Sequence, residues 1–151
     1  MAQSLSKLFV HIVFHTKHSQ KIIKTDVKHE LFAYIASIIK DNESIPIIIN
    51  GVEDHVHILC VMSKNMALSK LVELVKKHSS RWIKTKDLYY RNFGWQNGYA
   101  GFSVSPSLHD VTRNYIKNQV DRHRTKSFKE EYLELLKIHG IDFNEDYLWT
   151  D

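Results

Sequence analysis

Hydrophobic and polar positions follow two different periods along the chain, and each period predicts one kind of element. Residues 7–16 form a run rich in β-branched and aromatic side chains, which is typical of a buried strand. Residues 45–52 and 55–62 have the same character, and the polar pair Glu53-Asp54 between them predicts a hairpin. A fourth strand, interrupted by glycine, is expected over residues 99–105.

Apolar residues spaced three and four apart predict helices between and after these strands. The first helix is expected to begin at Asp26, whose side chain can cap it, and the second to cover residues 67–84. Two capping-box patterns, at residues 107–110 and 127–130, predict a third and a fourth helix. Gly140 is expected to end the fourth helix.

The order of these elements is β-α-β-β-α-β with helices appended, the split βαβ pattern of ferredoxin-like folds. We therefore predict an α+β fold, a sandwich in which helices lie on one face of an antiparallel sheet and extra C-terminal helices follow. The chain has 151 residues and no repeat or linker-like segment, so residues 1–151 are expected to form a single domain. Because this fold carries many unrelated functions, it does not define one.

The amino-acid composition excludes several classes of protein. Apolar residues make up 43% and charged residues 25% of the chain, which excludes a disordered protein. The single cysteine, Cys60, excludes an internal disulfide and a zinc site built from cysteines alone. No apolar run approaches the ~20 residues of a membrane span, and residues 1–7 lack the pattern of a secretory signal. We therefore expect a cytoplasmic protein with no membrane partner.

The formal net charge of +4 is distributed unevenly along the chain. Residues 64–91 contain eight basic and two acidic side chains, and residues 111–127 contain five and one. Residues 128–151 contain two basic and seven acidic side chains. This separation predicts a basic face suited to phosphates, although two ordinary solvated helix faces would produce the same pattern.

His55 and His57 are the sharpest candidates for chemistry. Residues two apart on a strand point the same way, so both imidazoles leave one face of the sheet together. Two neutral imidazoles side by side can begin a divalent metal site, which then needs a third protein ligand. The alternative is that both are polar residues on the solvated face of an amphipathic strand.

Tyr115 and Gln119 form the second candidate pair, in the third predicted helix. Positions four apart share a helix face, so the phenol and the amide are expected to project side by side. A tyrosine that faces a metal-held phosphate can act as a covalent nucleophile, and an amide oxygen can be a hard metal ligand. The alternative is that Tyr115 packs in the core and Gln119 faces water.

Together, these features resemble the single-tyrosine transposases of the HUH superfamily, the insertion-sequence-two-hundred family. The resemblance covers most of the chain. The matching segments are residues 9–14, residues 51–59 with both histidines, residues 95–105, residues 115–119, and the C-terminal stretch from Phe128 to Trp149.

The resemblance implies a metal-dependent DNA transposase. His55 and His57 would be the paired metal ligands, Gln119 the third ligand and Tyr115 the catalytic nucleophile, with Mg²⁺ or Mn²⁺ as the ion. Such enzymes cleave and rejoin single-stranded DNA at the hairpin-bearing ends of an insertion sequence, through a 5′-phosphotyrosine intermediate. The family also implies a homodimer, in which two subunits can share each active site.

On this interpretation the basic segments would contact DNA phosphates. The candidate cations are Lys70, Lys76, Lys77, Arg81, Lys84, Arg113, Arg122 and Arg124. Aromatic residues beside them could stack on unpaired bases, and the alternative, expected for at least half of them, is that they pack in the core. These are Tyr89, Tyr90, Phe93 and Trp95.

The base that activates the tyrosine is left open. Glu53, Asp54, Lys117 and His123 are near enough in the sequence to be considered. Three alternatives to a mobile-element transposase also stay open: a domesticated relative acting on genomic repeat hairpins, a non-catalytic nucleic-acid-binding module on the same fold, and a metal-dependent phosphoesterase that uses water.

Overall fold

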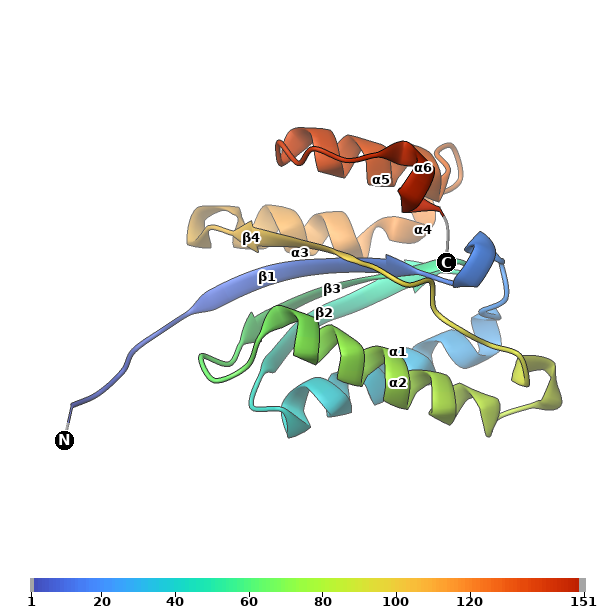
Figure 1. Cartoon of the computed structure of the whole chain (residues 1–151), viewed down its shortest axis with the longest axis horizontal. Helices are drawn as coiled ribbons and strands as arrows, with labels where there is room; N and C mark the ends of the chain where they lie inside the picture. The colour runs from blue at the N-terminus through green and yellow to red at the C-terminus, as the bar shows by residue number, and fades with distance from the viewer. Residues whose placement is uncertain (1, 150–151) are drawn as a thin grey trace.

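Four strands form one antiparallel sheet in the computed structural model, which describes residues 2–149 (Figure 1). The strand order is β2-β3-β1-β4. The strands are β1 (Leu8–His15), β2 (Ile45–Val52), β3 (His55–Met62) and β4 (Ala100–Val104). The predicted bounds of β2 and β3 are confirmed, and those of β1 and β4 are one residue too long at each end. Residues 1, 150 and 151 of the predicted single domain lie outside the described residues.

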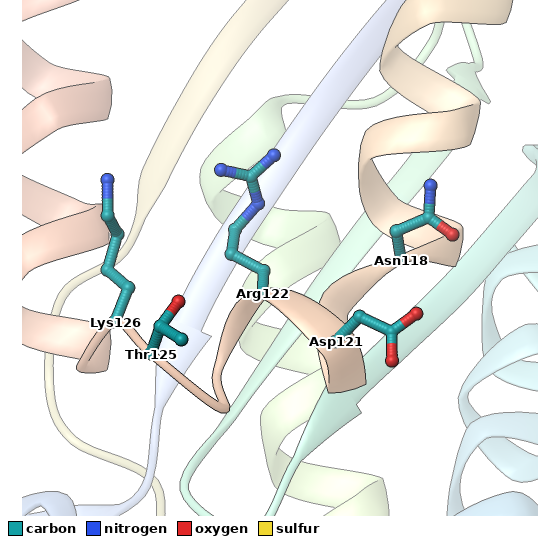
Figure 2. A pocket seen from close by; sticks show the side chains of 5 residues that line it. All are labelled: Asn118, Asp121, Arg122, Thr125 and Lys126. Atoms are coloured by element: carbon teal, nitrogen blue, oxygen red, sulfur yellow. The ribbon is translucent and has the colours of Figure 1, made fainter.

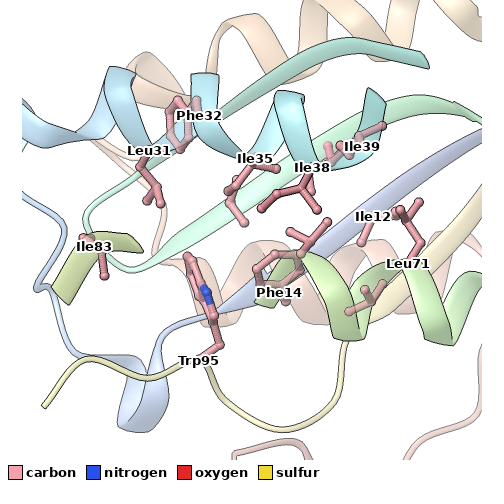
Figure 3. Packing of buried hydrophobic residues seen from close by; sticks show 14 of the residues in the cluster. Ile12, Phe14, Leu31, Phe32, Ile35, Ile38, Ile39, Leu71, Ile83 and Trp95 are labelled. Atoms are coloured by element: carbon pink, nitrogen blue, oxygen red, sulfur yellow. The ribbon is translucent and has the colours of Figure 1, made fainter. Parts of the chain in front are cut away.

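Helices α1 (Thr25–Asp41) and α2 (Leu68–Lys84) cover one face of the sheet (Figure 1). Their apolar stripes pack on alternate residues of the central strands and form the larger hydrophobic core (Figure 3). Phe14 from β1, Ile35 from α1 and Leu71 from α2 are fully buried in it. This layer is the one that the helical periodicity predicted.

The C-terminal helices cover the opposite face of the sheet (Figure 1). They are α3 (His109–Lys117), α4 (Gln119–Arg122), α5 (Phe128–Ile138) and α6 (Glu145–Leu148). A second hydrophobic core, which includes Val13, Phe102, Phe128 and Leu136, joins α5 to β1 and β4. The α+β prediction is therefore confirmed, and the appended helices give the sheet helical cover on both faces.

Short 3-10 helices connect these elements: η1 (Lys17–Ser19), η2 (Leu88–Tyr90) and η3 (Pro106–Leu108). No helix among residues 2–149 combines the length and the apolar character that crossing a membrane requires.

Two of the three predicted helix caps are wrong. Helix α1 begins at Thr25, so Asp26 lies inside its first turn, where a carboxylate still favours the helix dipole. At the start of α3, the Ser107 hydroxyl pairs with Ser105 and the Asp110 carboxylate pairs with His109, so no capping box forms. Ser107 and Asp110 therefore make their hydrogen bonds with neighbouring side chains and not with the helix end.

The third predicted cap is confirmed at α5. Ser127 and Glu130 make both hydrogen bonds of a capping box at its N-terminus. Gly140 adopts a φ of 65° two residues after the helix ends, a conformation in which glycine is favoured because it has no Cβ. The capping box fixes the N-terminus of α5 and therefore the position of the first turns of this helix.

The predicted third helix is interrupted at Asn118, between Tyr115 and Gln119. Asn118 has φ and ψ of −95° and 20°, and a separate short helix, α4, begins after it. The Asn50 side chain of β2 donates hydrogen bonds to the carbonyl oxygens of Ile116 and Lys117, at 2.9 and 3.1 Å. These bonds satisfy carbonyl groups at the end of α3, so the helix can stop there.

Candidate active site

His55 and His57 point toward the layer of C-terminal helices. The intervening residues of β3, such as Val56 and Ile58, point into the opposite core, as strand alternation requires. Both histidine side chains have an exposed fraction of 0%. The interpretation that they lie on a solvated strand face is therefore wrong.

Each imidazole is oriented by a partner on its Nδ1 atom. His55 Nδ1 donates to Asp54 Oδ1 at 2.7 Å, and His57 Nδ1 lies 2.8 Å from Nε2 of His11 on β1. Both rings therefore direct Nε2 toward the same interior point. Metal-binding histidines in proteins are commonly held in this way, with the outer nitrogen hydrogen-bonded and the inner one available to the ion.

Glu131, on α5, lies at that point with an exposed fraction of 1%. Its Oε1 atom is 3.3 Å from His55 Nε2 and 3.0 Å from His57 Nε2. His123 Nε2 lies 3.0 Å from the same oxygen. The second carboxylate oxygen, Oε2, accepts hydrogen bonds from the Tyr115 hydroxyl and, at 2.8 Å, from the Gln119 amide.

The structure brings all four predicted site residues together within one chain. Gln119 is fully buried, and its Oε1 atom is 3.1 Å from His55 Nε2. The half-buried ring of Tyr115 lies 5.8 Å from the ring of His57, centroid to centroid. The interruption at Asn118 therefore does not separate the phenol from the amide.

Glu131 had no assigned role in the sequence analysis, although a signal was present. It lies three residues after Phe128 and four before Leu135, on the apolar stripe of α5. A carboxylate in that position is buried, and a buried carboxylate needs partners. The sequence cannot name those partners, because they come from β3 and from the segment around α3 and α4.

The four candidate bases divide into two groups. Asp54 and His123 belong to the cluster, where Asp54 orients His55, and His123 bonds to Glu131 and Gln119. Glu53 and Lys117 are exposed. The carboxylate that touches the Tyr115 hydroxyl is Glu131, outside the set that was considered.

Burial and hydrogen bonding shift the pKa values of the cluster in opposite directions. Burial would lower the pKa of His55, but hydrogen bonds to Asp54 and Glu131 outweigh it and raise that pKa to about 9. For His57 burial prevails, and the pKa falls to about 4. Burial and the adjacent Glu131 charge raise the pKa of the Tyr115 phenol. One protonated imidazole is thus held between two carboxylates, next to a neutral phenol.

The donor set fits a divalent transition metal. The ligand atoms of His55, His57 and Glu131 all lie within 4.8 Å of one another, and the Gln119 amide oxygen adjoins them. Two imidazoles with a carboxylate and an amide oxygen form the mixed nitrogen and oxygen environment that such ions accept.

Helix α2, which carries the predicted basic residues 70–84, lies across the sheet from the C-terminal helices (Figure 1). Lys70, Lys77, Arg81 and Lys84 are exposed there. Lys76 instead donates hydrogen bonds to the carbonyl oxygens of Gln96, at 2.7 Å, and Gly98, and burial lowers its pKa to about 8. Lys76 thus anchors the loop before β4. The basic residues of α2 as a group lie away from the candidate active site.

Arg122 is the predicted cation that contacts Tyr115. Its guanidinium carbon lies 4.3 Å from the centroid of the Tyr115 ring. Beside it is a hollow of about 490 Å³ (Figure 2). The hollow is lined by Asn118, Asp121, Arg122, Thr125 and Lys126. The remaining two predicted cations are exposed, and Arg124 forms an ion pair with Asp121 at 3.0 Å.

Most of the aromatic residues proposed to stack on bases belong to the hydrophobic core. Tyr90, Phe93 and Trp95 have exposed fractions of 2%, 3% and 8%. Trp95 packs against Phe14 in the larger core (Figure 3), and Phe93 and Tyr90 belong to the same core. Tyr89 is 44% exposed, and the Lys24 ammonium group lies 3.9 Å from its ring centroid. The expectation that at least half of these aromatics pack in the core is therefore confirmed, and base stacking is excluded for the three buried rings.

The matching family and two solved structures similar to this chain are described as transposases. The family model described as IS200-like transposase matches residues 4–119. A protein of Deinococcus radiodurans R1 assigned as a transposase has a similar structure, with a TM-score of 0.61 and 21% identity over 79% of this chain and 98% of that one. A REP-associated tyrosine transposase bound to a REP hairpin has a TM-score of 0.54 and 12% identity, over 79% and 70% of the two chains. No curated protein matches the chain. At these identities the two structures establish the fold alone.

Proposed function

The chain belongs to the IS200-like transposase family, and we propose that it cleaves and rejoins single-stranded DNA through a covalent bond to Tyr115. The observation that carries this proposal is the convergence of the nucleophile with the imidazole pair. Tyr115 and Gln119 share one carboxylate with His55 and His57, although the two pairs are about sixty residues apart in the sequence.

His55, His57 and Gln119 would hold the divalent cation, Mg²⁺ or Mn²⁺. When bound, such an ion polarises a non-bridging oxygen of the scissile phosphate. The protein supplies the orientation: Asp54 and His11 fix the two imidazoles so that each Nε2 atom faces inward. These contacts support a site whose proposed ligands are oriented within the chain itself.

Tyr115 would attack the phosphorus in line with the leaving oxygen. The bond between the tyrosine oxygen and phosphorus forms while the bond to the 3′ oxygen breaks, and the leaving oxygen takes the electron pair and a proton. Tyr115 gives up its own proton in the same exchange, so charge and atoms balance. The product is a 5′-phosphotyrosine with a free 3′-OH, and a second 3′-OH can reverse the step.

The Arg122 guanidinium would contribute in two ways. Its positive charge beside the phenol lowers the pKa of Tyr115 and so opposes the effects of burial and of Glu131. It also lines the hollow formed with Asn118 and Lys126, where a phosphate of the DNA strand could bind.

We further propose that the substrate strand carries a hairpin and that the protein acts as a homodimer. The similar REP-associated transposase is described as bound to a REP hairpin, which supports a hairpin substrate here. The same likeness also supports a second candidate function, a domesticated transposase that acts on genomic repeat hairpins, because such an enzyme would use identical chemistry. In the single chain, Tyr115 and His57 both contact Glu131, so sharing of active sites between subunits would require exchange of the segment that carries Tyr115.

A denaturing gel tests the covalent mechanism directly. The full chain is incubated with Mn²⁺ and labelled single-stranded hairpin DNA, and Tyr115→Phe is compared with Tyr147→Phe, a change at a residue that is 76% exposed on α6. We expect an adduct with the wild type and with Tyr147→Phe, and none with Tyr115→Phe, while all three bind the hairpin. Cleavage without an adduct would assign the attack to water, and an adduct in Tyr115→Phe would exclude this nucleophile.

A further inference from the structure

We propose that Glu131 is itself a ligand of the divalent cation, contributed by α5 from beyond the family-matched residues 4–119. The inference rests on the proposed function and extends it. One carboxylate oxygen would bind the ion together with His55 and His57. The other would position the nucleophile Tyr115, so that a single side chain connects the metal to the attacking group.

The spacing of the inward-facing atoms supports this role. Ligands at right angles around an ion, each at about 2.1 Å, lie about 3.0 Å apart. Glu131 Oε1 is 3.0 Å from His57 Nε2 and 3.3 Å from His55 Nε2. The Gln119 Oε1 atom is 3.1 Å from His55 Nε2. Neighbouring atoms of this cluster are therefore separated as adjacent ligands of one ion would be.

Charge balance supports it as well. Glu131 and Asp54 have exposed fractions of 1% and 8%, and when ionised they carry two negative charges into the interior. Buried carboxylates require compensating charge. A divalent cation bound between the two imidazoles would supply two positive charges beside these carboxylates.

The start of α5 holds the carboxylate in place. Glu131 follows directly after the capping box of Ser127 and Glu130. Phe128 and Tyr132, on either side of it, are buried in the second core. The helix therefore has little freedom to withdraw Glu131, which is what a preorganised ligand requires.

The second oxygen of the carboxylate faces the nucleophile. Glu131 Oε2 accepts hydrogen bonds from the Tyr115 hydroxyl and from Gln119 Nε2. This arrangement fixes the direction of the phenol oxygen relative to the imidazole pair. A ligand set of two histidines and a carboxylate also favours Mn²⁺ over Mg²⁺, which prefers oxygen ligands and retains its waters.

Metal affinity separates a ligand from a carboxylate that only supports the fold. Isothermal titration of the full chain with Mn²⁺ compares the wild type, Glu131→Gln and the control Glu134→Gln. Glu134 lies on the same helix, is exposed and pairs with Lys126. We expect the Kd for Mn²⁺ to rise about 100-fold in Glu131→Gln, because even the outer partners of metal ligands typically contribute 10- to 100-fold. It should not change in Glu134→Gln.

Adduct formation at saturating Mn²⁺ tests the positioning of Tyr115 separately. We expect its rate in Glu131→Gln to fall by about tenfold or more, because the charged acceptor of the phenol is lost and small misplacements of reacting groups are costly. An unchanged rate at saturating metal would overturn the positioning role.

A second measurement does not depend on the stability of any variant. Anomalous scattering from wild-type crystals soaked in Mn²⁺ should show the ion with a Glu131 oxygen among its ligands. An ion held by His55 and His57 with the carboxylate turned away would overturn this inference, as would equal Mn²⁺ affinity in the wild type and in folded Glu131→Gln. In both cases the proposed function would stand. A wild type that binds no Mn²⁺ would overturn this inference together with the metal dependence of the proposed function.

Discussion

His11 Nε2 lies 2.8 Å from His57 Nδ1, so an imidazole on β1 orients a proposed metal ligand on the neighbouring strand β3. His11 is 3% exposed, and its burial lowers its pKa well below the ordinary value, which keeps the ring neutral. A neutral His11 can accept the Nδ1 hydrogen of His57. It thereby favours the His57 tautomer whose Nε2 lone pair binds metal.

Replacement of His11 should therefore weaken metal binding without removing a ligand. We expect the Kd for Mn²⁺ to rise by about 10- to 100-fold in His11→Gln, the range typical of partners that orient metal ligands. Isothermal titration measures the change. His29→Gln, on the exposed surface of α1, is the matched control. An unaltered Kd in His11→Gln would show that strand geometry alone orients His57.

Metal affinity should increase with pH up to about 9. The pKa of His55 is raised to about 9 because its hydrogen bonds with Asp54 and Glu131 outweigh the effect of burial. Below that pH the Nε2 atom carries a proton that the ion must displace, so the affinity should rise by about tenfold per pH unit. Titrations from pH 6 to pH 10 in buffers of different ionisation enthalpy also count the released protons, and we expect about one near pH 7. A pH-independent affinity would contradict the assignment of His55.

Arg122 should contribute more to DNA binding than the cations of α2. Each phosphate contact on a single strand contributes about 0.7 to the slope of log K against log salt. We expect Arg122→Gln to reduce that slope by about this amount for a single-stranded hairpin, since Arg122 contacts the Tyr115 ring and lines a polar hollow. Fluorescence anisotropy at several salt concentrations measures the slope.

Lys84→Gln, on the layer opposite the histidines, is the control for Arg122, and its slope should match the wild type. If Lys84→Gln lowers the slope while Arg122→Gln does not, the DNA passes over α2 instead, as the charge pattern alone suggested.

Gly51 should tolerate no side chain, because β2 and β3 approach closely there. A Cβ atom at Gly51 would lie 2.1 Å from the backbone oxygen of His55. Gly51→Ala should therefore lower the free energy of unfolding by about 1–3 kcal/mol, through strain where the strands pair. It should also weaken Mn²⁺ binding by displacing His55. Urea unfolding measures the stability.

Gly94→Ala is the control for Gly51, because the nearest atom to its added Cβ would be 3.7 Å away, in the Lys17 side chain. We expect no comparable loss of stability in this variant. Equal free energies of unfolding for Gly51→Ala and the wild type would show that β2 and β3 can move apart around the added Cβ without strain.

The sequence by itself determined the local features of this protein. Periodicity located all four strands and the two helices of the first layer, because alternation and helical spacing are properties of neighbouring residues. It placed His55 and His57 on one face of a strand, and the family resemblance selected Tyr115 and Gln119 as their partners. The family is confirmed by the match over residues 4–119.

Tertiary packing decided what surrounds those residues. Alternation shows that two side chains share a face of the sheet. It does not show which element covers that face, so the burial of the histidine pair beneath α5 could not be predicted. Glu131 is 74 residues from His57, and His11 is 46, and these contacts exist only because α5 and β1 pack against β3. The segments around α2 and α3 are both basic in the sequence, but the two helices lie on opposite faces of the sheet. Side chains distant along the chain meet only when burial of the two apolar cores offsets the entropy of ordering the segments between them.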